Sequence, residues 1–154
     1  ACVMRRAIDA HIMLYQVGIR NYSSEEIETR ITHQVHHVDA EQLYQRRYDS
    51  ARYASLSLPD DFPKVLYITF DVDAFDASLM SATGTPDPGG LLWWDAIELL
   101  EQLTAGRTII GFDVVELAPI ETLHHCDYTA AKLTYFLMGL TARRNRFLHD
   151  HTSC

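Results

Sequence analysis

Residues 65–73 read VLYITFDVD, and this stretch decides the fold class. Its first six residues carry no charge and are mostly apolar, which is typical of a strand buried on both faces of a parallel sheet. Asp71 and Asp73 close the strand. A second run of this kind, TIIGFDVV at residues 108–115, closes on Glu116. An apolar stripe at helical spacing lies between the two runs, so we expect strand, helix and strand in that order.

The same alternation extends toward both ends of the chain. Residues 14–19 and 34–38 are candidate strands, and Ser23 with Glu26 predicts a capping box that starts a helix between them. Strands alternating with helices indicate an α/β fold with a mainly parallel sheet. In such folds ligands bind beyond the carboxyl ends of the strands.

Two further helices are expected. One has polar faces and runs from Ala40 to about Ser55, and one is capped by Asp127 near the end of the chain.

Composition narrows the class of protein. The 154 residues are 47% hydrophobic and 22% charged, as expected for one soluble globular domain. A formal net charge of −8 argues against nucleic acid or an anionic membrane as a partner. No uncharged apolar run approaches the roughly 20 residues of a membrane span. Three widely separated cysteines and an N-terminus without a signal-peptide pattern predict a reducing, cytoplasmic compartment.

The acidic residues point to a cation. Between Val65 and Gly106 the chain has no lysine or arginine, although several aspartates and glutamates fall there. Asp71 and Asp73 leave the same side of an extended segment, so both carboxylates could reach one cation or two neighbouring ones. Carboxylates suit magnesium or manganese better than structural zinc. The alternative is that this Asp-x-Asp pair only caps a turn.

Three linked motifs resemble the arginase/agmatinase (ureohydrolase) family in order and spacing: TFDVDAFD at 69–76, ATGTPDPGGL at 82–91 and GFDVVELAP at 111–119. QVGIR at 16–20 and DYTAAKL at 127–133 are also similar to that family, so the resemblance spans nearly the whole chain. The PGG at 88–90 resembles the agmatinase-type branch more than the animal arginases.

The resemblance implies an arginase-like three-layer α/β/α fold and a role for each matching residue. It implies that Asp71 bridges two Mn²⁺ ions and that Asp73 binds one of them. It places Thr85 beside the substrate guanidinium, pairs Glu116 with that group, and gives Asp76 the task of orienting the metal-site loop. The implied reaction is hydrolysis of a guanidino compound of the agmatine or arginine type to urea and an amine, by a metal-bridging hydroxide. A homo-oligomer, trimer or hexamer, is implied as well.

The family pattern is incomplete in this chain. The family's other four metal ligands come from an earlier histidine motif and an Asp-x-His-x-Asp motif, and neither is present. Asp9-Ala10-His11 does not match, because no carboxylate follows it. Ala77 stands where the family usually has proline. We therefore expect residues 1–154 to be the C-terminal part of a single ureohydrolase domain, incomplete as an enzyme by itself.

Two other functions stay open. One is a non-catalytic structural or assembly piece with an incomplete metal site, and the other is a related metal-dependent amide hydrolase. Glu116 distinguishes a ureohydrolase from an amide hydrolase, because a carboxylate suits a cationic guanidinium better than a neutral amide. The histidines match no family ligand. His33, His36 and His37 are expected on a strand, and His124 and His125 in a loop after Glu116. His149 and His151 are expected in the polar tail.

Overall fold

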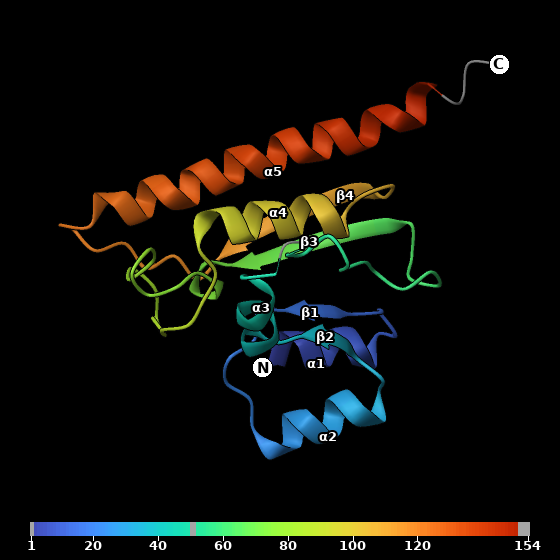
Figure 1. The fold of residues 1–154 in the computed structure, drawn as a ribbon, viewed down its shortest axis with the longest axis horizontal. Coiled ribbons are helices and arrows are strands. Elements are labelled where there is room, and N and C mark those ends of the chain that lie inside the picture. Colours follow the sequence, from blue (N-terminus) through green and yellow to red (C-terminus); the bar gives the residue numbers. More distant parts are fainter. Residues whose placement is uncertain (1, 50–51, 151–154) are drawn as a thin grey trace. The chain divides into compact units, whose positions relative to one another are not determined.

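The chain forms two compact units, Ala1–Pro63 and Lys64–Cys154. The structure, a computed structural model, describes residues 2–49 and 52–150 (Figure 1). Each unit contains two parallel strands and at least two helices. The α/β class and the parallel pairing that the sequence predicts are thus confirmed.

The first unit is built around a short parallel pair of strands. Its elements in chain order are α1 (Cys2–Asp9), β1 (Tyr15–Val17), α2 (Ser24–Thr32), β2 (His36–Val38) and α3 (Ala40–Arg46). β1 pairs with β2 from Tyr15 opposite His36 to Val17 opposite Val38. The capping box is confirmed: the Ser23 hydroxyl accepts from the Glu26 N–H at 3.2 Å, and the Glu26 carboxylate accepts from the Ser23 N–H at 2.8 Å.

Helix α3 is shorter than the sequence predicts. We expected it to run from Ala40 to about Ser55, but it ends at Arg46. Arg52 has a φ of 41°, a left-handed conformation that a regular α-helix does not contain. The apolar residues that follow Arg46 therefore lie in turns, and one of them, Tyr53, is buried.

The second unit contains the two long strands. Its elements are β3 (Val65–Asp71), the 3₁₀ turn η1 (Val72–Ala74), α4 (Trp93–Leu103), β4 (Thr108–Val115) and α5 (His124–Asp150). β3 and β4 pair in parallel from Val65 opposite Thr108 to Asp71 opposite Val115, with one irregularity after Leu66. Both strands match the predicted ranges closely, because a run of mainly apolar residues marks each of them.

Helices α4 and α5 lie side by side in this unit (Figure 1). The Lys132 ammonium of α5 lies 5.2 Å from the Trp93 ring centroid, and Arg144 donates to the Glu101 carboxylate at 2.8 Å. Leu66 and Ile109 are buried, whereas Tyr67, on the other face of the sheet, is 60% exposed. Within the described part of this unit, the helices therefore cover one face of the sheet, while the other lies open.

The start of α5 differs from the prediction. The helix begins at His124, so Asp127 lies in its first turn instead of capping it. His124 and His125, expected in a loop, are the first two helical residues. The Leu123 N–H donates to the Ile120 carbonyl at 2.8 Å, and this tight turn brings the helix start forward. Asp127 still favours the helix, because a carboxylate near the N-terminus interacts well with the helix dipole.

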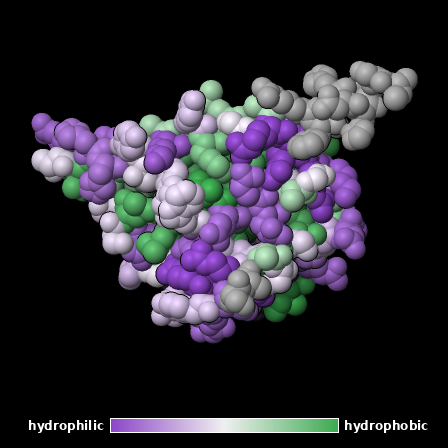
Figure 2. All heavy atoms as spheres, turned by 45° about the horizontal axis from the view of Figure 1, so that its top comes forward, coloured by the Kyte–Doolittle hydropathy of each residue, from purple (hydrophilic) through white to green (hydrophobic). Residues whose placement is uncertain are grey.

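Two further observations complete the fold. In the part of the chain that the structure describes, no helix combines the length and apolar character needed to cross a bilayer. Hydrophilic and hydrophobic residues are mixed over the face seen in Figure 2. The side chain of His149 and all of His151 lie outside the described residues.

Candidate active site

Strand β3 delivers the first two acidic residues. Asp71 is its last residue, and η1 turns the chain immediately afterwards. One Asp71 carboxylate oxygen accepts the Asp73 N–H at 3.1 Å. The turn expected by the alternative interpretation of the Asp-x-Asp pair is therefore present, and it engages only one oxygen of Asp71. A turn and a cation site are compatible here.

The loop after η1 folds back on itself through Asp76. The Asp76 N–H donates to the Leu91 carbonyl at 2.9 Å, and the Leu91 N–H donates to the Ala74 carbonyl at 2.9 Å. The Asp76 carboxylate accepts the N–H groups of Ser78 at 2.9 Å and Gly89 at 2.8 Å. Hydrogen bonds from Ser78, and then from the glycines at 89 and 90, hold the pKa of Asp76 below its usual range. The charged Asp76 carboxylate thus links the start of the loop, at Ser78, to its end, at Gly89.

The returning loop brings Thr85 to the acid pair. Its hydroxyl donates to the Asp73 carboxylate at 2.9 Å. Thr85 itself is exposed, so its other side faces solvent. The residue that the family resemblance places beside the substrate therefore lies against one of the two acids assigned to the metal.

Strand β4 delivers the third acid. Glu116 follows the last residue of β4 and has a φ of 65°. Its carbonyl accepts the Thr83 hydroxyl at 2.9 Å, and Thr83 bridges Leu117 in antiparallel fashion. The loop that carries Thr85 thus also contacts the residue on which guanidinium binding was predicted to depend.

The acidic side chains of the two strand ends interact electrostatically. Partial burial, followed by the nearby negative charges of Asp73 and Glu116, raises the pKa of Asp71 to about 6. A cation between these carboxylates would relieve the repulsion, and carboxylate oxygens are ligands that Mn²⁺ accepts. Within the described residues, however, no group of three or more His, Cys, Asp or Glu side chains is arranged to hold a metal. The fit to manganese is therefore partial and rests on Asp71 and Asp73.

This raised pKa makes a prediction for the metal-free chain. The folded chain binds the Asp71 proton more tightly than the unfolded chain, so its contribution to stability is present at low pH and is lost as the pH rises through about 6. Because Asp71 is only half-buried, solvent screening limits the loss to about 1 kcal/mol. When the pH is raised from 4.5 to 7.5, the unfolding free energy of the wild type should therefore fall by about 1 kcal/mol more than that of Asp71→Asn. Urea titrations with chelator present measure this difference. Equal losses in both proteins would contradict the assignment.

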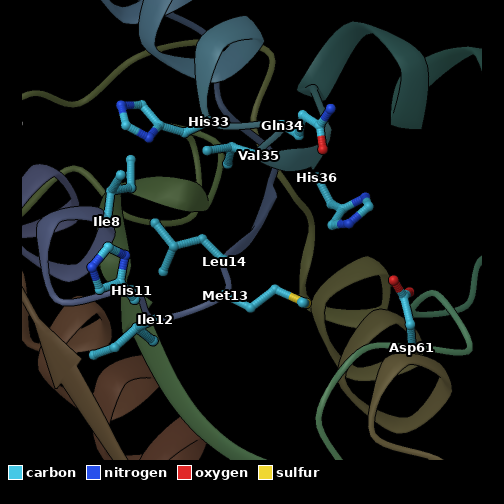
Figure 3. Close-up of a pocket in the computed structure, with 10 residues that line it drawn as sticks. All are labelled: Ile8, His11, Ile12, Met13, Leu14, His33, Gln34, Val35, His36 and Asp61. Carbon is cyan, nitrogen blue, oxygen red and sulfur yellow. The ribbon is translucent and has the colours of Figure 1, made fainter.

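The first histidine set lies in the other unit. His36 and His37 are on β2, as expected, but His33 caps the C-terminal end of α2 instead of lying on a strand. Figure 3 shows His33 and His36 with His11 at the wall of a cavity of about 400 Å³ in that unit. They come from three separate segments and form no metal-binding group among the described residues.

Two positions of the site escaped the sequence-based prediction. Thr83 contacts Glu116, and Gly90 packs so closely that an added Cβ would lie 2.5 Å from the Asp76 nitrogen. Both belong to the motif ATGTPDPGGL, in which the family resemblance gave a role to Thr85 alone. The Gly-Gly pair was a usable signal, because glycine is required where two backbones approach closely.

Comparison with known proteins places the chain in a family. The sequence model of the Arginase family matches residues 1–139. The chain belongs to the arginase family. It is 35% identical over 143 residues to an agmatinase of Pyrococcus horikoshii, covering 93% of this chain and 48% of that protein. It is 32% identical to the N(1)-aminopropylagmatine ureohydrolase of Thermococcus kodakarensis, covering 95% of this chain and 48% of that protein.

Solved structures agree with the arginase-family fold. The agmatine ureohydrolase of Thermoplasma volcanium matches with a TM-score of 0.73 and 30% identity, over 97% of this chain and 49% of that protein. An arginase from Medicago truncatula matches with a TM-score of 0.70 and 27% identity, over 84% of this chain and 40% of that protein. The chain spans about half the length of the curated relatives it matches. The recognised family and the arginase-like α/β fold are thereby confirmed.

Proposed function

We propose that this chain belongs to an enzyme that hydrolyses a guanidino compound, of the agmatine or arginine type, to urea and an amine with manganese as cofactor. The observation that carries the proposal is that Asp71, Asp73 and Glu116 lie at or just beyond the carboxyl ends of two paired parallel strands. Such ends are where α/β folds bind ligands. Membership of the arginase family supports the same chemistry.

Each side chain has a distinct task in this proposal. Asp71 and Asp73 would hold manganese, whose chemistry is to lower the pKa of a bound water so that hydroxide is available near neutral pH. Glu116 binds the guanidinium, since a carboxylate can accept two parallel N–H groups of that planar cation. Thr85 lies between acid pair and solvent, where its hydroxyl can orient the same group. Asp76 fixes the loop on which Thr85 is mounted.

Agmatine is the substrate we put first. The two relatives compared above are named for agmatine and aminopropylagmatine. We further propose a cytoplasmic homo-oligomer, trimer or hexamer, that uses neither nucleic acid nor a membrane as a partner. The exposed large side chains of α5, Tyr128, Tyr135 and Met138, offer surface for subunit contact.

The test uses the full-length gene product, because the chain covers only half of its relatives. We expect urea release with manganese from at least one of agmatine, arginine and guanidinobutyrate, and its loss on chelation with recovery on adding manganese back. Absence of urea from all three substrates, in a folded and manganese-loaded protein, would refute the proposed function.

A second candidate function is that of a non-catalytic assembly piece. Two observations favour it: the described residues bring together fewer than three metal ligands, and one face of the β3–β4 sheet is open, with Val65, Tyr67 and Ile110 exposed. Parallel sheets are normally covered on both faces, so this face is suited to a partner segment. Metal analysis of the purified 154-residue chain decides between the functions. Two tightly bound manganese ions per chain would rule the assembly role out.

A further inference from the structure

Glu116 adopts a backbone conformation that its side chain disfavours. Its φ of 65° lies in the left-handed region, where a Cβ atom crowds the following carbonyl group. In the described part of the second unit, it is the one residue other than glycine with a positive φ. Such a conformation persists only where the surroundings enforce it, and it is common at functional sites.

The surroundings that enforce it come from residues 82–83. The Thr83 hydroxyl donates to the Glu116 carbonyl at 2.9 Å, and Thr83 is only 8% exposed. Thr83 also forms an isolated antiparallel β-bridge with Leu117, and the Ala118 N–H donates to the Ala82 carbonyl at 2.9 Å. The backbone contacts align the two segments. The Thr83 hydroxyl is the side-chain contact to the strained residue itself.

The next threonine of the same segment contacts the opposite part of the site. Thr85, two residues after Thr83, donates to the Asp73 carboxylate at 2.9 Å, whereas Thr83 donates to the Glu116 carbonyl. Gly84 between them has free space where a Cβ would lie. One short segment is therefore hydrogen-bonded both to the acid pair that ends β3 and to the acid that follows β4.

We propose that Thr83 is a positioning residue, whose hydroxyl holds Glu116 in its left-handed conformation and so directs the Glu116 carboxylate toward the substrate guanidinium. The inference rests on the proposed function for its consequence, but not for its geometry. Thr83 and Thr85 together set the separation between the group that binds guanidinium and the acids that hold the metal. Neither threonine takes part in bond breaking.

The first test measures geometry in the 154-residue chain. We expect NMR backbone shifts and the amide–Hα coupling of Glu116 to report a positive φ in the wild type and in Thr83→Ser, which keeps the hydroxyl. Thr83→Val and Thr83→Ala remove it and should move Glu116 toward negative φ. Thr134→Val is the matched control, because the Thr134 hydroxyl also donates to a backbone carbonyl, that of Ala130, at 2.9 Å within α5.

The second test measures function in the full-length gene product. Thr83→Val and Thr83→Ala should raise KM for agmatine about tenfold, which is the loss expected for one buried hydrogen bond, while manganese affinity changes less than twofold. Thr83→Ser should restore KM to within about threefold of the wild type. A purely structural role would lower thermal stability and leave KM and the Glu116 φ unchanged in the folded variants.

The outcomes separate this inference from the proposed function. If the wild-type gene product releases no urea, the proposed function fails, while the NMR comparison still decides whether Thr83 fixes Glu116. An unchanged Glu116 φ in both Thr83→Val and Thr83→Ala would overturn the inference even in an active enzyme. So would a Thr83→Ser variant as impaired in KM as Thr83→Ala.

Discussion

Replacing Glu116 with glutamine should reduce kcat/KM for agmatine in the full-length gene product by at least about a hundredfold. Glutamine keeps the shape of the side chain but removes the charge that we propose to pair with the guanidinium. Losing one partner of such a charge pair costs about 3 kcal/mol, or roughly two orders of magnitude in rate. Besides partial burial, the negative charge of Glu116 contributes to the raised pKa of Asp71, so these two carboxylates lie within electrostatic reach of each other. Steady-state urea release with saturating manganese is the measurement.

The control for this variant is Glu121→Gln. Glu121 is exposed and lies five residues further along the chain, so its replacement removes an equal charge from the same region. Its activity should stay within about twofold of the wild type, and both variants should bind manganese normally. Undiminished activity in Glu116→Gln would contradict guanidinium pairing by Glu116.

The parts of the fold that the sequence predicts well are those in which one local pattern dominates. β3 and β4 are uncharged or nearly uncharged apolar runs with an acid at or beyond the end, and their observed ranges agree with the prediction to about one residue. The boundaries of α3 and α5 were wrong because they depend on turns. Arg52 adopts a positive φ, and the turn from Ile120 to Leu123 starts α5 three residues ahead of Asp127.

The candidate site divides in the same way. Motifs and strand ends were sufficient to select Asp71, Asp73 and Glu116, because residue type and spacing carry that information. The contacts of Thr83 were not predictable, since a hydroxyl that reaches a carbonyl 33 residues away leaves no periodic trace in the sequence. The family resemblance selected Asp76 as the residue that orients the loop, but it did not identify the N–H groups of Ser78 and Gly89 that its carboxylate accepts.

Gly90→Ala should be the most damaging small change in the loop that carries the site. An added Cβ would lie 2.5 Å from the Asp76 nitrogen and from the Phe75 carbonyl carbon, and 2.6 Å from the Phe75 oxygen. These are backbone atoms, which cannot rotate away as a side chain would. We expect a loss of about 2–3 kcal/mol in unfolding free energy, as for other overpacked positions.

The same substitution should weaken manganese binding by the full-length gene product at least tenfold. Relieving the clash displaces the backbone at residues 75–76, which directly follows η1, where Asp73 lies. It also disturbs the 3.3 Å hydrogen bond that the Gly90 N–H donates to the Asp76 carboxylate in the same loop. Urea unfolding and manganese titration measure the two effects separately.

Gly84→Ala is the matched control, because a Cβ at Gly84 would have no heavy atom within 4 Å. It should change the unfolding free energy by less than about 0.5 kcal/mol and leave manganese affinity intact. Equal behaviour of the two variants would show that close packing at Gly90 does not set the position of the loop. A Gly90→Ala protein that is destabilised but binds manganese normally would show that the loop shifts without moving Asp73, and the two effects would then have separate causes.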